Sequence, residues 1–351
     1  MGSNKWEGKR HPRTSKHYTK NQVAKKGSYI VDYFNNRGFF GLSILFLIIF
    51  SVIASGNFVV PQRGYGTLHN IATWISSDDT SCFVAVVCNL IIGVLLVTLN
   101  IMYRYIKTYN CFVFAALFIL LQGINPFLST RFFAGTAMCL VVVIALFFLF
   151  DLYGKQQLAS QGVFLIMALL SFFSIYHYVF LLLVPLFIVG LIYMRAINVR
   201  SVLAIIFGLI TPYWIALGTG LESMSSFNAP HIAEVWTSAP AYTGKGWAIS
   251  VAIATIALTV ILTITNLKTM LNYSVHVRAY NNFFITLSIF VVLMMAIDYN
   301  DFLLYMPLLN MCFVIQFGHW YVITNHETRQ PITMWLLVAM LTVFIIAMVI
   351  A

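Results

Sequence analysis

The chain alternates between long apolar blocks and short polar turns along nearly all of its length after residue 38. Each block approaches the ~20 apolar residues that a membrane-spanning helix needs, and none has the alternating pattern of a barrel strand. The pattern predicts an all-α fold, a polytopic transmembrane helix bundle with about 11 spans (10–12). The expected helices cover residues 39–60, 81–102, 111–128, 132–152, 161–176, 178–194, 201–218, 247–267, 283–298, 302–322 and 332–351.

The stretch from Gln156 to Met194 decides the orientation, because it carries no charge and is too long for one crossing. A single helix over 161–194 would be ~50 Å long, against a hydrocarbon core of ~30 Å. With the N-terminus inside, two spans place 17 Lys and Arg residues inside and 3 outside, whereas one span gives 13 and 7. The positive-inside rule favours two spans. We therefore expect His177 at the outward tip of a tight hairpin, the N-terminus in the cytoplasm and the C-terminus outside.

Composition leaves no room for a sizeable soluble domain. The chain is 61% hydrophobic and 9% charged, with a mean hydropathy of +0.89, whereas a soluble domain has roughly 25% charged residues. We expect two parts: a basic, disordered cytoplasmic tail over residues 1–38 and a single transmembrane helical domain over 39–351. The lipid bilayer is the predicted partner, and the predicted location is the inner membrane of a bacterial cell.

The net charge of +10 comes largely from the tail. Nine of the 20 Lys and Arg residues lie in the first 37 positions: Lys5, Lys9, Arg10, Arg13, Lys16, Lys20, Lys25, Lys26 and Arg37. A basic segment directly before a first span sets orientation and attracts anionic lipid headgroups, so we expect no nucleic-acid partner. The tail has no apolar core of a cleavable signal peptide, and we expect the first span to direct insertion.

The five cysteines predict no site. Each lies within or at the end of an expected span, and none forms a CxxC pair: Cys82, Cys88, Cys111, Cys139 and Cys312. We expect small apolar packing residues there, with no zinc site and no disulfide framework. No nucleotide-binding loop or catalytic triad is present either, so no metal and no cofactor are predicted.

The segment "NPFLSTR" (125–131) breaks one apolar run and starts the next. Pro126 ends a span, and Ser129 or Thr130 is expected to cap the following helix. Arg131 stands at its outer start, against the topology rule and at the positive end of a helix dipole. It therefore needs an anionic partner. That partner is either a protein carboxylate or lipid headgroup, or a substrate phosphate that the guanidinium holds bidentately.

Two more polar groups lie on the expected outer face. The turn "DYNDF" (298–302) holds Asp298 and Asp301, which are either hydrated turn residues or a general base and counter-charge near Arg131. His177 is either an interfacial residue bonded to a neighbouring backbone carbonyl or tyrosine, or a proton carrier with a near-neutral pKa. Arg131, His177, Asp298 and Asp301 are the predicted catalytic residues.

The outer loops supply the predicted substrate-binding residues Arg63, Asp78, Asp79 and Trp236. Carboxylates such as those of "SSDD" (76–79) would activate an acceptor hydroxyl in a lipid-linked glycosyl transferase. Residues 66–77 have apolar side chains at helical spacing and predict a short helix on the outer surface. The longest outer loop, 219–246, has aromatic residues that place it at the interface.

Several polar residues fall inside the expected spans and are expected to face other helices: Asn89, Asn100, Gln122, Asn310, Gln316 and His319. We interpret them as hydrogen-bonding residues between helices. No carboxylate is expected at mid-membrane, which disfavours a proton-driven transporter.

Residues 150–214 resemble a group of uncharacterised multi-spanning inner-membrane proteins of Bacteroidota. The resemblance rests on the tight apolar hairpin, on Asn198 and Arg200 in the inner turn, and on the "GLxTPY" pattern from Gly208 to Tyr213. It implies a location in the inner membrane and no particular chemistry.

A second stretch is similar to polysaccharide polymerases of the EpsG and Wzy type, which pair an arginine at the start of a span with a histidine at an outward tip. Arg131, Lys155 and His177 occupy those places. The resemblance implies an outward-facing enzyme that joins glycan units on a polyprenyl-pyrophosphate carrier. The chain departs from the pattern: Phe132 replaces an expected glutamine, and "PQRGYGTLHN" (61–70) lacks an expected aspartate.

Three functions remain open at this point. The outward Arg, His and Asp residues favour a glycan polymerase or lipid-linked glycosyl transferase. The Bacteroidota resemblance fits a non-catalytic membrane subunit of envelope assembly or secretion equally well. A transporter fits the number of spans but lacks a buried ionisable site.

Overall fold

The computed structural model describes residues 33–54, 78–106, 112–155, 159–220, 245–270 and 273–350. The chain divides into two units, Met1–Tyr33 and Phe34–Ala351. The second unit carries the helices that follow, and its described residues contain no strand.

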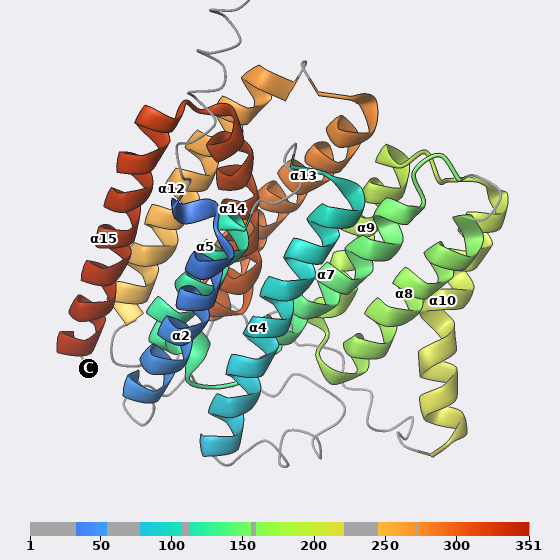
Figure 1. Ribbon diagram of the computed structural model, residues 1–351. Helices are drawn as coiled ribbons and strands as arrows, with labels where there is room; N and C mark the ends of the chain where they lie inside the picture. Colours follow the sequence, from blue (N-terminus) through green and yellow to red (C-terminus); the bar gives the residue numbers. More distant parts are fainter. Residues whose placement is uncertain are drawn as a thin grey trace, which may run out of the picture. The chain divides into compact units, whose positions relative to one another are not determined.

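The described α-helices run in chain order as shown in Figure 1. They are α2 (Arg37–Ala54), α4 (Asp78–Tyr103), α5 (Val113–Ile124), α6 (Pro126–Ser129), α7 (Ala134–Asp151), α8 (Ala159–Tyr176), α9 (Val179–Tyr193), α10 (Val199–Gly218), α12 (Lys245–Thr269), α13 (Val275–Ile297), α14 (Met306–Ile323) and α15 (His326–Ile350). Two 3₁₀-helices, η2 (Tyr33–Asn35) and η5 (Tyr299–Tyr305), complete the described elements.

Each expected apolar block coincides with an apolar helix, so the predicted all-α class is confirmed. Within the described ranges, 9 helices are long and apolar enough to cross a membrane, and α5 and α9 are shorter apolar helices. The uncharged stretch before Met194 forms two helices, because α8 ends at Tyr176 and α9 begins at Val179. The count of eleven spans and the orientation of the termini stay predictions.

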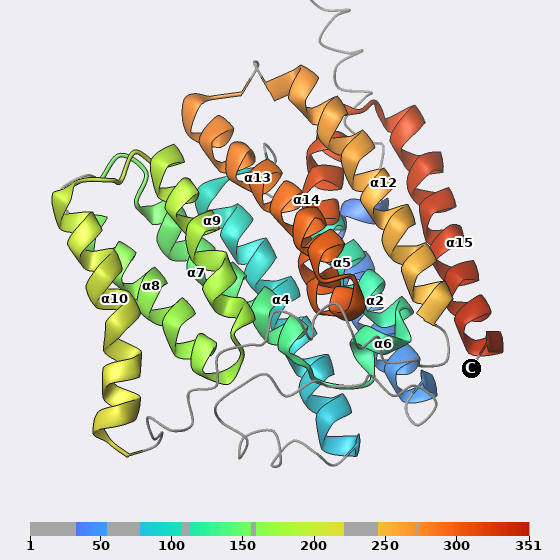
Figure 2. The same ribbon diagram turned by 180° about the vertical axis from the view of Figure 1, so that it is seen from behind.

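The helix α14 lies at the centre of the unit. Every residue from Met306 to His319 is buried, whereas only 22% of the most apolar 18-residue window is buried in α10, in α12 and in the stretch Glu327–Val349 of α15. A helix that is hydrophobic on all sides belongs in the interior of a bundle. The less buried helices expose rows of large apolar side chains, and these faces contact the lipid bilayer. Figures 1 and 2 show α14 between α5 on one side and α13 on the other.

The "GLxTPY" pattern fastens α10 to α8. Added to Gly208, a Cβ atom would lie 2.8 Å from the backbone carbonyl oxygen of Phe164, so only glycine permits this approach. The Ser171 hydroxyl donates to the Leu209 carbonyl at 2.6 Å, and the Ser174 and Tyr213 hydroxyls lie 2.5 Å apart. These bonds between neighbouring helices satisfy polar groups that lipid cannot.

The helix α13 begins at Val275, eight residues before the expected start of its span at 283. The sequence pattern excluded these residues because they are polar or charged. The structure gives them partners in other helices: the Tyr280 ring stacks on Phe150 with centroids 4.2 Å apart, and Asn281 accepts a hydrogen bond from Asn266.

The break after α5 differs from the expectation in one respect. Asn125 accepts a hydrogen bond from the Phe127 backbone N–H at 3.2 Å and so caps the short helix α6. The expected capping of the following helix by Ser129 or Thr130 was wrong. Both hydroxyls donate back to carbonyls four residues earlier, at 3.5 Å and 2.8 Å, and α7 begins after Phe133 without a side-chain cap.

Candidate functional site

One end of the helical unit gathers the predicted catalytic residues. Successive helices alternate in direction, so the start of α7, the turn between α8 and α9, and η5 lie at the same end as the C-terminus of α15 (Figures 1 and 2). We call this the η5 end. Arg131, His177, Asp298 and Asp301 all belong to it.

The start of α7 packs directly on η5. A Cβ atom on Gly135 would collide with the carbonyl oxygen of Leu304 and lie 3.0 Å from its carbonyl carbon. One turn further along, the Cys139 thiol lies 3.7 Å from the carbonyl oxygen of Pro307. The close approach holds the turn that carries Arg131, three residues before α7, at the level of η5.

The same turn is fixed on its other side by α4. The Phe132 backbone N–H donates to the Ser81 hydroxyl at 2.9 Å, and the Cys82 thiol lies 3.9 Å from the Ser129 carbonyl oxygen. Arg131 itself is half-buried and engages in a further interaction. The anionic partner expected from the sequence stays a prediction.

The two carboxylates lie on η5 and at its entrance. Asp298 is the last residue before η5, and its Oδ2 accepts a hydrogen bond from the Tyr305 hydroxyl at 3.5 Å. Asp301 occupies a kink in the 3₁₀-helix, with φ −107° and ψ 30°. Both carboxylates are half-buried, and each engages in a further interaction. The contact with Tyr305 ties the two ends of η5 together.

A second cation joins this end from α12. The Lys245 ammonium lies 5.9 Å from the centroid of the Tyr299 ring, within cation–π range. Trp247, two residues on, faces Phe127 of α6 with centroids 6.1 Å apart. Lys245 was not among the predicted site residues. The sequence pattern gives no sign that α12 begins beside η5.

His177 also lies at the η5 end. It belongs to the turn between α8 and α9, whereas η5 joins α13 and α14. Its Nδ1 accepts a hydrogen bond from the Val179 backbone N–H at 3.3 Å. Burial lowers the pKa of His177 to about 4, so the imidazole is neutral at neutral pH. This partner is a backbone N–H group, whereas a backbone carbonyl or a tyrosine was expected from the sequence. A neutral imidazole offers one N–H donor and no charge for an anion.

The remaining predicted residues fall only partly within the described ranges. Asp78 and Asp79 are the first two residues of α4, which begins at the η5 end. Arg63 and Trp236 lie outside the described residues, as do the expected surface helix over 66–77 and most of the loop over 219–246.

The interior polar residues face other helices, as predicted. Asn89, Asn100, Gln122, Asn310, Gln316 and His319 are all between 0% and 2% exposed. No Asp, Glu, Lys or Arg side chain is buried among the described residues. The same part of the chain holds no group of three His, Cys, Asp or Glu residues able to bind a metal.

A hydrogen-bonded amide cluster lies near the opposite end. The Asn266 amide donates to Asn281 at 3.0 Å and to Gln316 at 2.7 Å, and it accepts from the Tyr273 hydroxyl at 3.3 Å. This cluster joins α12, α13 and α14. Of the six residues interpreted from the sequence as hydrogen-bonding between helices it contains Gln316, whereas the amides of Asn89 and Gln122 have no hydrogen-bond partner among the described residues.

The apolar helices define an integral, multi-pass membrane protein with its charged side chains at helix ends and turns. Comparison of the chain with protein-family models, curated proteins and solved structures finds no match.

Proposed function

We propose that the protein is an outward-facing enzyme of the bacterial inner membrane that acts at the η5 end on a lipid-linked glycan. The substrate would be a sugar unit on a polyprenyl-pyrophosphate carrier, and the reaction would be glycan polymerisation or glycosyl transfer. One observation carries the proposal: the packing of Gly135 on the Leu304 carbonyl brings the turn with Arg131 to the helix with Asp298 and Asp301.

The two cations suit the carrier. The Arg131 guanidinium can hold a pyrophosphate bidentately, and Lys245 adds a point charge at the same end. Binding of the leaving pyrophosphate is the interaction that strengthens as the glycosidic bond breaks, which makes it useful for catalysis.

The carboxylates suit the acceptor. Asp298 or Asp301 would accept the proton of the attacking hydroxyl as that oxygen bonds to the anomeric carbon and the carbon–pyrophosphate bond breaks. His177 has a separate role in this proposal. Its neutral imidazole holds the α8–α9 turn and presents an N–H donor.

The test uses conservative variants of the full-length chain in the membrane. Arg131→Lys should lower the conversion of lipid-linked glycan by about ten-fold or more, because an ammonium does not replace a bidentate contact. Asp298→Asn and Asp301→Asn remove the base candidates without changing shape. The matched control is Asp151→Asn, which breaks an exposed 2.6 Å ion pair with Lys155 at the opposite end.

The readout is accumulation of lipid-linked glycan and loss of surface polymer, normalised to the amount of protein in the membrane. Normal glycan in Arg131→Lys, Asp298→Asn and Asp301→Asn would refute the enzyme. The alternative is then a non-catalytic membrane subunit of envelope assembly or secretion.

A further inference from the structure

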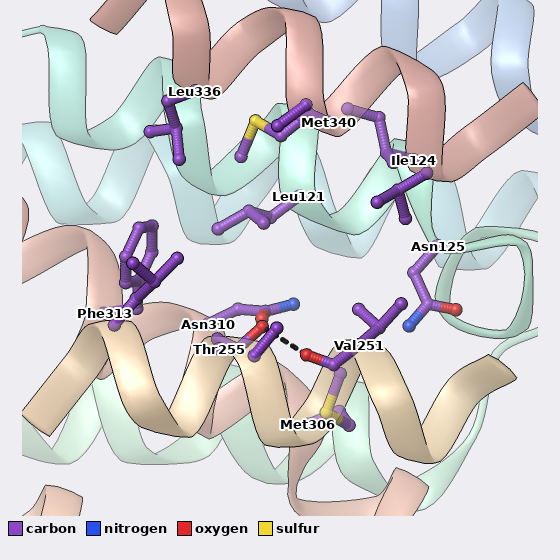
Figure 3. A pocket seen from close by; sticks show the side chains of 14 residues that line it. Leu121, Ile124, Asn125, Val251, Thr255, Met306, Asn310, Phe313, Leu336 and Met340 are labelled. Atoms are coloured by element: carbon purple, nitrogen blue, oxygen red, sulfur yellow. Dashed lines mark hydrogen bonds between the residues drawn. The ribbon is translucent and has the colours of Figure 1, made fainter. Parts of the chain in front are cut away.

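A cavity of about 150 Å³ lies between α5, α12, α14 and α15. Its walls are apolar apart from Asn125, Thr255 and Asn310, and Thr255 already donates its hydroxyl to the Val251 carbonyl (Figure 3). An engineered cavity of about this volume holds a benzene molecule, so the space accommodates roughly six carbon atoms of a chain.

Two buried amides face this cavity. Asn125 and Asn310 are 3% and 1% exposed, and their amide nitrogens point toward the open space in Figure 3. The Asn125 side-chain oxygen is occupied by the Phe127 N–H, while its nitrogen has no hydrogen-bond partner. The buried side-chain oxygen of Asn310 has none either. An unpaired amide group in an apolar wall is costly. The Asn125 nitrogen therefore requires an acceptor, and the Asn310 nitrogen faces the same space.

The mouth of the cavity opens to lipid. Ala254 of α12 and Ala339 of α15 both line it, and both are exposed on helices that are only 22% buried. A small side chain on each wall leaves the entrance open between two lipid-facing helices. A molecule that enters there comes from the bilayer.

The depth of the amides identifies the chemistry of that molecule. Asn125 directly follows the last residue of α5, so it lies at the level where an apolar span ends. The ester carbonyl of a glycerolipid lies at this boundary between the hydrocarbon core and the headgroups. An isoprenoid chain, by contrast, carries no acceptor along its hydrocarbon.

We propose that this cavity binds one acyl chain of a membrane glycerolipid, and that the ester carbonyl accepts hydrogen bonds from Asn125 and Asn310. The chain enters between Ala254 and Ala339 and fills the space beside Leu121. This binding site does not depend on the proposed glycan reaction, and its test uses no glycan.

The first experiment measures entry. The protein is reconstituted into vesicles of phosphatidylethanolamine and phosphatidylglycerol that contain phosphatidylglycerol with a diazirine in one ester-linked chain. After photolysis, labelling of α5 at Leu121 is compared with labelling at the lipid-facing Ile261, which is 57% exposed. Ala254→Phe and Ala339→Phe should each lower the ratio about ten-fold by closing the mouth. The matched control Ala257→Phe, exposed on α12 but not lining the cavity, should leave it unchanged.

The second experiment measures the carbonyl contact. Against an ether-linked analogue of the same probe, the ester-linked lipid should label the cavity about five-fold more strongly, as one neutral hydrogen bond predicts. Asn310→Leu should lower that preference, because only the Asn125 donor then remains, while labelling at Ile261 persists.

Three outcomes would overturn the proposal. They are labelling at Leu121 no stronger than at Ile261, equal labelling of the cavity by the ester and ether probes, and labelling of the cavity by a photoreactive polyprenyl phosphate that exceeds labelling by the ester lipid. Weak labelling at Leu121 would indicate that water, and not an acyl chain, occupies the cavity. Normal glycan turnover in an Ala254→Phe protein whose cavity is no longer labelled would support the lipid site and show that the glycan reaction does not need it.

Discussion

Replacing Gly208 by alanine should loosen the pair α8–α10. The new Cβ atom would lie 2.8 Å from the Phe164 carbonyl oxygen and 2.8 Å from the Met167 Cβ atom. A side-chain terminus can rotate away from such a contact, but a backbone carbonyl inside a helix cannot. The helix α10 must therefore move outward, and its hydrogen bonds to Ser171 and Ser174 lengthen with it.

The expected magnitude follows from three opposing contributions. Gly→Ala in a helix stabilises by about 1 kcal/mol through backbone entropy. Overpacking costs about 1–3 kcal/mol, and each weakened interhelical hydrogen bond costs roughly 0.6 kcal/mol. The variant should therefore be destabilised by about 1–3 kcal/mol. The control is Gly218→Ala in the same helix, which meets nothing within 4 Å and should be neutral or slightly stabilising.

The free energy of unfolding is measured on detergent-solubilised protein by titration with sodium dodecyl sulfate, followed by tryptophan fluorescence. A Gly208→Ala protein as stable as Gly218→Ala would show that the helices do not approach as closely as the structure places them. A loss of stability in both variants would assign the effect to helix α10 itself and refute the argument from the α8 backbone.

Three further outcomes are expected. In intact cells, an impermeant thiol reagent should label Tyr299→Cys and spare Ser274→Cys, since both residues are exposed but lie at opposite ends of α13; the reverse result would invert the orientation. Stability should fall by up to about 3 kcal/mol as the pH drops from 6.5 to 4, because burial lowers the pKa of His177 to about 4 and the unfolded state then binds more protons. This dependence should weaken in His177→Gln and persist in the exposed His276→Gln, and an unchanged profile in the first would contradict it. Asn266→Leu should cost about 1–2 kcal/mol in the same titration, because it leaves two buried acceptors on α13 and α14 without their donor, and a neutral effect would refute that contact.

The positions of the helices were predictable because apolar blocks of spanning length have one stable form in lipid. The separation at His177 followed from the distribution of Lys and Arg. The predictions of the start of α13 and of the capping by Ser129 or Thr130 were wrong, because these polar residues have partners that the pattern of apolar and polar positions does not reveal. The start of α13 depends on Phe150, more than a hundred residues away, and the hydroxyl of Thr130 had a nearby carbonyl in α6 to bind.

The site was predictable only as a set of residues at one end. Alternation of the spans brought Arg131 and Asp298 to the same face, but it does not say which helices are neighbours. The contact of Gly135 with η5 and the place of Lys245 depend on packing between segments that are distant in the chain. The cavity beside Asn125 has the same origin, since its walls come from four separate helices.

The buried amide side chains in the interior differ in whether they have a hydrogen-bond partner. Gln122 and Asn89 are both 0% exposed, and neither amide has a hydrogen-bond partner within the described ranges, whereas Gln316 accepts from Asn266 at 2.7 Å. Replacing an unpaired buried amide by an apolar group of similar shape is neutral or stabilising, but removing one partner of a bonded pair costs about 1–3 kcal/mol. Gln122→Leu should therefore leave the free energy of unfolding unchanged or raise it by about 1 kcal/mol. The same substitution at Gln316 should lower it.

Both variants are compared with wild type in the detergent titration, where they share the same change of side-chain length and shape. If Gln122→Leu destabilises as strongly as Gln316→Leu, the Gln122 amide has a partner after all, which would have to be bound water or a ligand between α4 and α5. A stabilised Gln122→Leu protein that loses glycan conversion would instead show that the unpaired amide is kept for the reaction at the expense of stability. Stabilisation with full conversion would mean that Gln122 contributes to neither.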